Sequence, residues 1–471
     1  MIHYKEDLKP GEEIISSQQI LDLSDPIFDP TTRPSLEEAI AMIIGKQGGY
    51  EIPFASVTLK RHNEMANQNL FRCLFGRDAL LIADLLSVHR PELLRNVVLA
   101  LGAVQGKNEV DASEEEFGRI AHEVREVDDP RALEIMREGN WLFPYYGAVD
   151  ATLIWVKAVS TIVGKEPTFL DFVVNGESIG DRVIDASTWM LRRLNSQSGL
   201  IESYRKNPQG IENQVWKDSG DSYMHKDGTL ALQNTCSSIE TVAETYDALI
   251  TLSYLVGKFP SERWPMTSEG FQAEAKRVQR KLLDSFWLGD RFALAIARNE
   301  KGEQVPLDSQ ASNQGRLLDS AILDGDEYAL YRKAIAQAIT HPRLLGDSGL
   351  RSLASDHVSY RPGGYQTGSA WPMDGVFAAR GLLRYGFTQE AHEIMSRLIK
   401  TIEAFGGYPE YFRGDYPLHT IITTSIIDAS WLPSSQRAGY NRVAQPPQLI
   451  QGWTVGAYAW LSIHGRTGHA N

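Results

Sequence analysis

The sequence contains little cysteine, no long apolar run and no excess of positive charge. Its 471 residues include two cysteines, Cys73 and Cys236, which lie far apart in the chain. Two separated cysteines supply neither a disulfide framework nor the repeated spacing of a structural metal site. No stretch approaches the roughly 18 consecutive apolar residues of a membrane-spanning helix. We therefore expect a protein without disulfides, a bound metal, another cofactor or a membrane span.

Negative charge dominates the chain, which carries a net charge of −13 at pH 7. Repulsion from phosphate groups makes nucleic acids and anionic membranes poor partners for such a protein. The N-terminal residues 1–7 are polar and lack the apolar core of a signal peptide. These features predict a cytoplasmic protein that binds neither nucleic acid nor membrane, and they leave its oligomeric state open.

Helix signals fill most of the chain. Ser35, followed by Glu37 and Glu38, has the pattern of a helix N-cap and an acidic first turn, and this helix extends to about Gly45. Residues 47–61 favour short strands. From residue 78 onward the expected helices are 78–88, 92–104, 146–163, 183–194, 237–256, 272–286, 327–339, 373–385, 389–405, 420–431 and 448–464.

The arrangement of these helices predicts an all-α protein with two layers. Some helices, such as 246–256, are apolar on more than one face, which is typical of helices enclosed by others. Long loops at 107–145, 196–234, 341–370 and 406–419 are rich in Trp, Tyr, Asp, Glu and His, and loops of this length are usually functional. We expect a double-layered helical barrel over 66–471, with its loops at one end, and an irregular or β-containing extension over 1–65.

The loop 213–222 has the composition of a sugar-binding and catalytic segment. It combines Trp216, Lys217, Asp218 and Asp221 with a glycine and two serines. Neither a helical period nor a strand alternation explains this order of residues. An aromatic ring can stack on a sugar, and a carboxylic acid can protonate a departing glycosidic oxygen. The alternative interpretation is a surface turn with acidic caps.

Other loops repeat this mixture of aromatic and charged residues. Arg77 and Asp78 follow a glycine, where Asp78 is either a helix cap or a hydrogen-bonding partner for sugar hydroxyls. Glu410 stands between aromatic residues, which can raise the pKa of a carboxyl group or frame a water molecule. The glycine-rich segment 361–374 lacks the spacing of a phosphate-binding loop.

Six phrases together resemble a known family of enzymes. They are Phe-Gly-Arg-Asp at 75–78, Arg-Ile-Ala-His-Glu-Val-Arg at 119–125, Tyr-Gly-Ala-Val-Asp at 146–150, Trp-Lys-Asp-Ser-Gly-Asp at 216–221, Gly-Ser-Ala-Trp-Pro at 368–372 and Pro-Glu at 409–410. In this order they resemble the bacterial amylo-α-1,6-glucosidase (glycogen debranching, C-terminal) family, which is related to glycoside hydrolase family 63. The resemblance implies an (α/α)6 barrel.

The resemblance also implies roles for individual residues. It makes Asp218 the general acid and Glu410 the general base, with Asp221 as the rival acid. Trp371 is implied to be a platform for the substrate ring. The full set of implied substrate-binding residues is Arg77, Asp78, His122, Glu123, Tyr146, Asp150, Trp216, Lys217, Asp221, Gln366 and Trp371.

Some positions depart from the family pattern. Glu126-Val127-Asp128 follows the phrase at 119–125 where the family has a glycine and an acidic residue, and Gln366 and Thr367 stand where it often has His and Asn. The 65 residues before the expected barrel are too few for a transferase domain or a β-sandwich. A small α-glucoside is therefore the expected substrate rather than polymeric glycogen.

Three hypotheses follow from these residues. The first is an inverting, exo-acting α-glucosidase that uses Asp218 and Glu410. The second is a related barrel enzyme, a phosphorylase or an epimerase, although an acidic Glu410 does not suit a phosphate site. The third is a sugar-binding barrel without turnover.

Overall fold

Helices are the predominant regular element of the structure, a computed structural model that describes residues 13–15, 34–57, 71–196, 198–232, 235–405, 407–414, 422–424 and 450–465. The described α-helices are α2 (Leu36–Ile43), α4 (Gly76–Leu85), α5 (Glu92–Ala103), α6 (Pro130–Arg137), α7 (Asp150–Val163), α8 (Ile179–Leu194), α9 (Ile239–Val256), α10 (Ser268–Lys281), α11 (Ala329–Thr340), α12 (Pro372–Arg384), α13 (Thr388–Phe405) and α15 (Gly452–His464). Shorter helical turns are η2 (Asp111–Ser113), η3 (Pro167–Asp171), η4 (Leu282–Phe286), η5 (Ser312–Leu317), η6 (Ala321–Leu323) and η7 (Asp326–Tyr328).

The strands of the described residues are short and antiparallel. The two-stranded pairs are β1 (Glu13–Ile15) with β14 (Ile422–Thr424), β2 (Ile44–Gln47) with β3 (Tyr50–Pro53), β4 (Ser56–Val57) with β15 (Ile450–Gln451), β5 (Leu74–Phe75) with β6 (Glu123–Val124), β7 (Val173–Val174) with β8 (Glu177–Ser178), and β12 (Leu345–Gly346) with β13 (Gly349–Leu350). The strand β10 (Ala295–Arg298) lies between β9 (Ser237–Ser238) and β11 (Gln304–Leu307).

Local sequence explains where several helices begin. Ser35 and Glu38 form a capping box, in which each side chain accepts a hydrogen bond from the other residue's backbone N–H. Ser178 and Ser238 cap α8 and α9 in the simpler way, with the hydroxyl accepting from a backbone N–H of the first turn. Pro372 opens α12 at a position where no N–H is needed.

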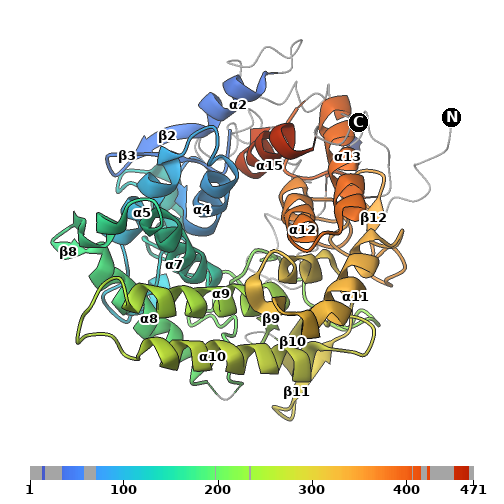
Figure 1. Ribbon diagram of the computed structural model, residues 1–471. Coiled ribbons are helices and arrows are strands. Elements are labelled where there is room, and N and C mark those ends of the chain that lie inside the picture. The colour runs from blue at the N-terminus through green and yellow to red at the C-terminus, as the bar shows by residue number, and fades with distance from the viewer. Residues whose placement is uncertain are drawn as a thin grey trace.

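The helices are arranged in two layers around a centre (Figure 1). In the inner layer α4 contacts α7, α7 contacts α9, α9 contacts η5, η5 contacts α12, α12 contacts α15, and α15 contacts α4. Each inner element also contacts an outer helix: α5 packs on α4, α8 on α7, α10 on α9, α11 on η5, α13 on α12 and α2 on α15. Nearly all residues of α7 and α12 are buried, as expected for helices with neighbours on several sides.

Most expected helices agree with these elements, but several expectations do not. Residues 422–424 form the strand β14 and not part of a helix; Ile422, Thr423 and Thr424 are β-branched and favour a strand. The rest of the expected helix 420–431 lies outside the described residues. The helix α6 was not expected, although Asp129 caps it and Pro130 follows. The expected helix at 146–163 begins only at Asp150.

The described part of residues 1–65 packs against the end of the chain. Strand β4 pairs with β15, and α2 contacts α15. The boundary of a separate extension at residue 65 stays a prediction. None of the described helices has the combined length and apolarity of a membrane span.

Candidate active site

The first turns of the inner helices carry the charged residues of the site. Asp78 lies in the first turn of α4, Asp150 opens α7, Glu240 lies in the first turn of α9, and Asp374 in that of α12. A helix N-terminus carries a partial positive charge that stabilises a nearby carboxylate. The fold therefore gathers four acidic side chains, from distant parts of the sequence, on helix ends that favour negative charge.

Arg77 connects three of the predicted site residues. Its Nη1 lies 3.0 Å from Oδ2 of Asp150, its Nε 3.5 Å from Oδ1 of Asp78, and its Nη2 3.8 Å from Oδ2 of Asp218. The Arg77 side chain is only 3% exposed. We call these four residues (Arg77, Asp78, Asp150 and Asp218) the Arg77 cluster. One cation serves three carboxylates, so the cluster has an excess of negative charge when all of them are ionised.

Burial and this excess of negative charge favour protonation of two carboxylates. Burial and the charge of Asp150 together raise the pKa of Asp218 to about 6, against the opposing charge of Arg77. Burial also raises the pKa of Asp78 to about 7, again opposed by Arg77. The Asp218 side chain is still 36% exposed, so a ligand can reach it. A carboxyl group that keeps its proton near neutral pH is suited to general acid catalysis.

The loop that carries Asp218 is fastened at several points. The backbone N–H of Val149, just before α7, donates to the carbonyl oxygen of Gln214 at 2.8 Å. The side chain of Lys217 turns away from Asp218 and donates to the carbonyl oxygen of Ser352 at 2.7 Å. Asn213 donates to the carbonyl oxygen of Ser219 at 2.8 Å across the loop. These bonds hold Asp218 in a fixed position relative to α7.

Lys217 is a buried cation beside two buried acids. Burial lowers its pKa to about 8, against the opposing charges of Asp374 and Glu240. Burial likewise raises the pKa values of Asp374 and Glu240. Glu240 accepts hydrogen bonds from Asn313 at 2.9 Å and Tyr223 at 3.1 Å. Lys217 therefore joins an internal polar group beneath the loop, and its predicted contact with substrate stays a prediction.

Glu410 lies in an aromatic environment. The Tyr365 hydroxyl donates a hydrogen bond to Oε1 of Glu410 at 2.8 Å. Burial raises the pKa of Tyr365 well above its usual value, and the charges of Glu410 and Asp218 raise it further. Asp218 and Glu410, which are far apart in the sequence, thus both act on the same phenol group.

Trp371 lies at the centre of an aromatic cluster and is 1% exposed. The centre of its ring is 4.9 Å from that of Tyr365, 5.3 Å from Tyr411, 5.7 Å from Trp216 and 5.8 Å from Trp453. In this arrangement the ring supports Tyr365 and Trp216. Its expected role as a stacking platform for sugar stays a prediction.

Two predicted residues have mainly internal partners. His122 packs edge-on against Phe75, and burial together with Arg77 and Arg119 lowers its pKa well below the usual value, so that the ring is neutral. Glu123 forms an ion pair with Arg125. Their predicted contacts with substrate stay predictions.

Tyr146 and Asp221, two further predicted contacts, also bond within the protein. The Tyr146 hydroxyl donates to the carbonyl oxygen of Val104 at 2.7 Å. Asp221 accepts from the hydroxyl of Ser219 at 2.9 Å. The structure therefore places neither side chain among the members of the Arg77 cluster.

Gln366 has unused hydrogen-bonding capacity. Both polar atoms of its side-chain amide are buried without a hydrogen-bond partner among the described residues, and so is the hydroxyl of the neighbouring Thr367. Leaving a buried polar group unpaired costs about 1–3 kcal/mol. Such groups beside an active site suit a polar ligand that supplies the missing bonds.

The sequence offers few signs of three residues near the site. Glu240 and Asp374 look like ordinary acidic residues in the first turn of a helix. Tyr365 lies within the glycine-rich segment 361–374 and has no motif of its own. Their proximity to the predicted residues is visible only in three dimensions.

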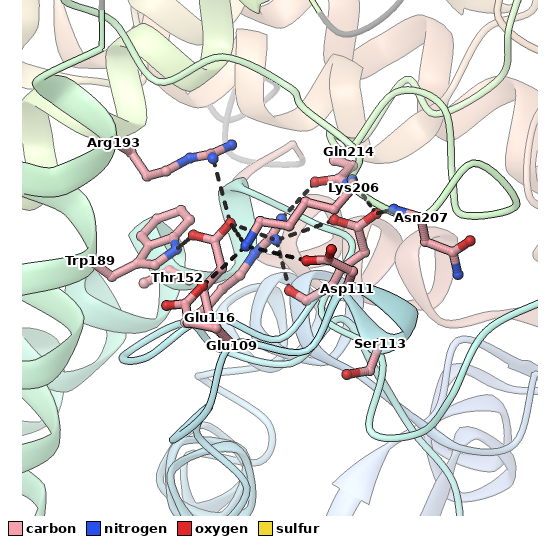
Figure 2. A network of polar contacts seen from close by, with 12 residues as sticks. Glu109, Asp111, Ser113, Glu116, Thr152, Trp189, Arg193, Lys206, Asn207 and Gln214 are labelled. Atoms are coloured by element: carbon pink, nitrogen blue, oxygen red, sulfur yellow. Dashed lines mark hydrogen bonds and ion pairs between the residues drawn. The ribbon is translucent and has the colours of Figure 1, made fainter.

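A second polar cluster includes Gln214, which precedes Asp218 in the same loop (Figure 2). We call it the Glu116 network, which consists of Glu109, Glu114, Glu116, Arg119, Trp189, Arg192, Arg193, Lys206 and Gln214. Arg119 is fully buried and donates to the side-chain oxygen of Gln214 at 2.6 Å. Glu116 accepts from Trp189 at 2.7 Å and lies 3.3 Å from the amino group of Lys206. The network joins loop 107–119 to the chain just before Trp216.

Neighbouring cations compensate the negative charge of Glu116. Burial acts to raise its pKa, but Arg119, Arg193 and Lys206 lower it to about 2. Within the described part of the chain, no group of three or more His, Cys, Asp or Glu side chains is arranged to hold a metal ion.

Comparison with solved structures places this fold among the glycosidases. The GH63 mannosylglycerate hydrolase from Thermus thermophilus in complex with glucose matches with a TM-score of 0.55 at 13% identity, covering 91% of this chain and 99% of that chain. A wild-type glycosidase matches with a TM-score of 0.53 at 15% identity, covering 91% and 95%. A glycosidase variant in complex with glucose matches with a TM-score of 0.51 at 15% identity, again covering 91% and 95%.

The sequence itself identifies the family. Residues 178–416 match the mannosylglycerate hydrolase MGH1-like glycoside hydrolase domain, and the chain belongs to this family of glycoside hydrolases. No curated protein matches the sequence significantly. The expected relation to glycoside hydrolase family 63 is supported, whereas no comparison supports the amylo-α-1,6-glucosidase family.

Proposed function

We propose that this protein is an inverting, exo-acting α-glucosidase that hydrolyses a small α-glucoside within an (α/α)6 barrel. The observation that carries this proposal is the Arg77 cluster, in which Asp218 lies 3.8 Å from Arg77 with its side chain 36% exposed. The hydrogen bond from Tyr365 to Glu410 and the charges of Glu410 and Asp218, which both raise the pKa of Tyr365, also support it. Inverting glycosidases need two carboxyl groups on opposite sides of the sugar, roughly 6.5–9.5 Å apart. The ring of contacts from α4 to α15 and back to α4 supports the barrel.

Asp218 is the proposed general acid. Its raised pKa, about 6, lets it hold a proton that it can give to the departing glycosidic oxygen. Its partial exposure leaves it accessible to substrate. Asp221 suits this role less well, because its carboxylate already accepts a hydrogen bond from the hydroxyl of Ser219.

Glu410 is the proposed general base, which takes a proton from the attacking water. The hydrogen bond from Tyr365 favours the ionised form that this role requires. After the water attacks the anomeric carbon, the new carbon–oxygen bond replaces the glycosidic bond on the opposite face of the sugar. The proton from water goes to Glu410, and the aglycone leaves with the proton from Asp218.

The substrate is proposed to be small. The GH63 mannosylglycerate hydrolase of similar fold was solved with glucose, which supports a sugar in the present site. The unpaired amide of Gln366 provides donors and an acceptor for sugar hydroxyls or a polar aglycone. Of the other substrate contacts proposed from sequence, Arg77 lies 3.8 Å from Asp218, and Asp78 and Asp150 lie beside Arg77.

One screen tests this function. The purified protein is incubated with α-linked disaccharides, glucosylglycerate, mannosylglycerate and short maltooligosaccharides, and sugar release is measured. Proton NMR of the fresh product then gives its anomeric form. Release of the β-anomer from an α-linked glucoside is the expected result. The α-anomer would contradict inversion, and release that requires phosphate would favour a phosphorylase.

A further inference from the structure

Tyr365, which donates a hydrogen bond to Glu410, is itself held by hydrogen bonds to its backbone and by aromatic contacts with its ring. The backbone carbonyl oxygen of Tyr365 accepts hydrogen bonds from the indole N–H of Trp371 at 2.9 Å and from the hydroxyl of Ser369 at 2.6 Å. The edges of the Tyr365 and Trp371 rings meet at an angle of 84° between their planes, and those of Tyr365 and Tyr411 at 89°. Backbone and ring of Tyr365 are therefore both held.

The segment that carries Glu410 is joined to the same structure. Ala370 and Phe412 exchange a pair of backbone hydrogen bonds, each 2.9 Å long. This pair links the residues before α12 with the residues around Glu410. Tyr365 and Glu410 are therefore positioned by one connected unit, and the 2.8 Å bond between them closes it.

We propose that Tyr365 is a positioning residue for hydrolysis, which donates its phenol proton to Oε1 of Glu410 and thereby orients the carboxylate toward the attacking water. This inference rests on the proposed role of Glu410 as general base. Tyr365 keeps its proton throughout; only Glu410 accepts the proton of the water. Besides Glu410, the titratable groups that act on Tyr365 are Asp218 and Tyr411.

The substitution Tyr365→Phe removes only the hydroxyl and keeps the ring packing. Because a hydrogen bond to a carboxylate stabilises its ionised form, the pKa of Glu410 should rise without it. The acidic limb of the kcat/KM profile should move to higher pH by about one unit, and kcat should fall about tenfold to a hundredfold. KM should change by less than about threefold, since the ground-state contacts of the substrate remain.

Tyr458→Phe is the matched control. The Tyr458 hydroxyl also donates to a glutamate, Oε1 of Glu403, at the same distance of 2.8 Å. That pair joins α15 to α13 and has no part in the proposed reaction. The control should keep the wild-type kcat and pH profile. An unmoved acidic limb in Tyr365→Phe, or an equal change in both variants, would overturn the inference.

A second measurement separates this inference from the proposed function. The carboxyl pKa of Glu410 is measured by NMR of protein with ¹³C-labelled glutamate, and the signal is assigned by its loss in Glu410→Gln. A higher pKa in Tyr365→Phe supports the positioning bond, and an unchanged pKa refutes it, whether or not a substrate is found. Absence of turnover in the wild type, or full activity of Glu410→Gln, would instead refute the proposed function.

Discussion

The Arg77 cluster and the Glu116 network are both partly buried, yet the carboxyl groups of Asp218 and Glu116 have pKa values shifted in opposite directions. In the network, Arg119, Arg193 and Lys206 surround Glu116 and lower its pKa to about 2. In the cluster, one arginine is shared among three carboxylates, and the pKa of Asp218 rises to about 6. Burial acts to raise the pKa of each carboxyl group, but the several cations around Glu116 outweigh its effect there.

The opposite pKa shifts indicate different roles for the two carboxyl groups: Glu116 contributes to stability, and Asp218 is the proposed general acid. A carboxylate with several cations stays ionised and acts as a fixed connection between loops. A carboxyl group that shares one cation with other carboxylates stays protonated to higher pH and can donate that proton. The hydrogen bond from Arg119 to Gln214 lies just before Trp216 in the chain, so the Glu116 network supports the loop that carries the proposed general acid.

Replacement of the proposed acid and base should have the largest effect on activity. Asp218→Asn and Glu410→Gln should each lower kcat on the order of 10²–10⁴-fold, since each removes one proton transfer. The melting temperature of both variants should stay close to that of the wild type. Asp221→Asn is the comparison variant and should lose far less activity.

A substrate with a good leaving group sharpens this test. Such a substrate needs little protonation, so it should partly restore the rate of Asp218→Asn. It should not restore Glu410→Gln, where the water lacks its base. Equal rescue of the two variants, or rescue of neither, would mean that the roles are assigned wrongly.

Removing the charge of Glu116 from the Glu116 network should lower the free energy of unfolding. Glu116 titrates at 4.5 in the unfolded chain and at about 2 in the folded one, so it contributes about 3 kcal/mol above pH 4.5 that is lost as the pH falls toward 2. Glu116→Gln should remove about this much in urea unfolding at pH 7. It should also flatten the acid-side dependence. Exposed Glu300→Gln is the control and should change neither quantity.

The pH profile tests the cluster directly. Asp218 must be protonated to act, so kcat/KM should fall as the pH rises above about 6, by about tenfold for each further unit. Asp150→Asn removes a negative charge that raises the pKa of Asp218. The basic limb of this variant should therefore move to lower pH, whatever its maximal rate. A shift to higher pH would contradict the charge-sharing explanation.

A partly exposed ion pair should have the smallest effect. Arg343 lies 3.2 Å from Asp356, and the two side chains are 52% and 50% exposed. Water screens such a pair, which contributes about 1 kcal/mol or less. Arg343→Met should lower the free energy of unfolding by no more than that amount and leave kcat unchanged. A loss as large as that of Glu116→Gln would show that exposure does not explain the difference.

Local sequence determined much of the fold. Capping residues such as Ser35 and Ser238 act on their own first turn, so the positions of many helices follow from neighbouring residues alone. Local signals were insufficient at β14, whose strand depends on pairing with β1 near the opposite end of the chain. Short phrases around Asp218 and Glu410 also suggested the candidate acid and base, and these roles stay predictions.

What surrounds those residues was decided only by tertiary structure. The sequence phrases predicted a substrate contact for both Glu123 and Arg77. In the structure Glu123 pairs with Arg125, whereas Arg77 lies beside Asp218. The bond from Tyr365 to Glu410 also spans 45 residues and has no local signature. Burial and charge sharing set a pKa, and both depend on which distant helices meet in space; a sequence pattern names the ionisable groups but not their neighbours.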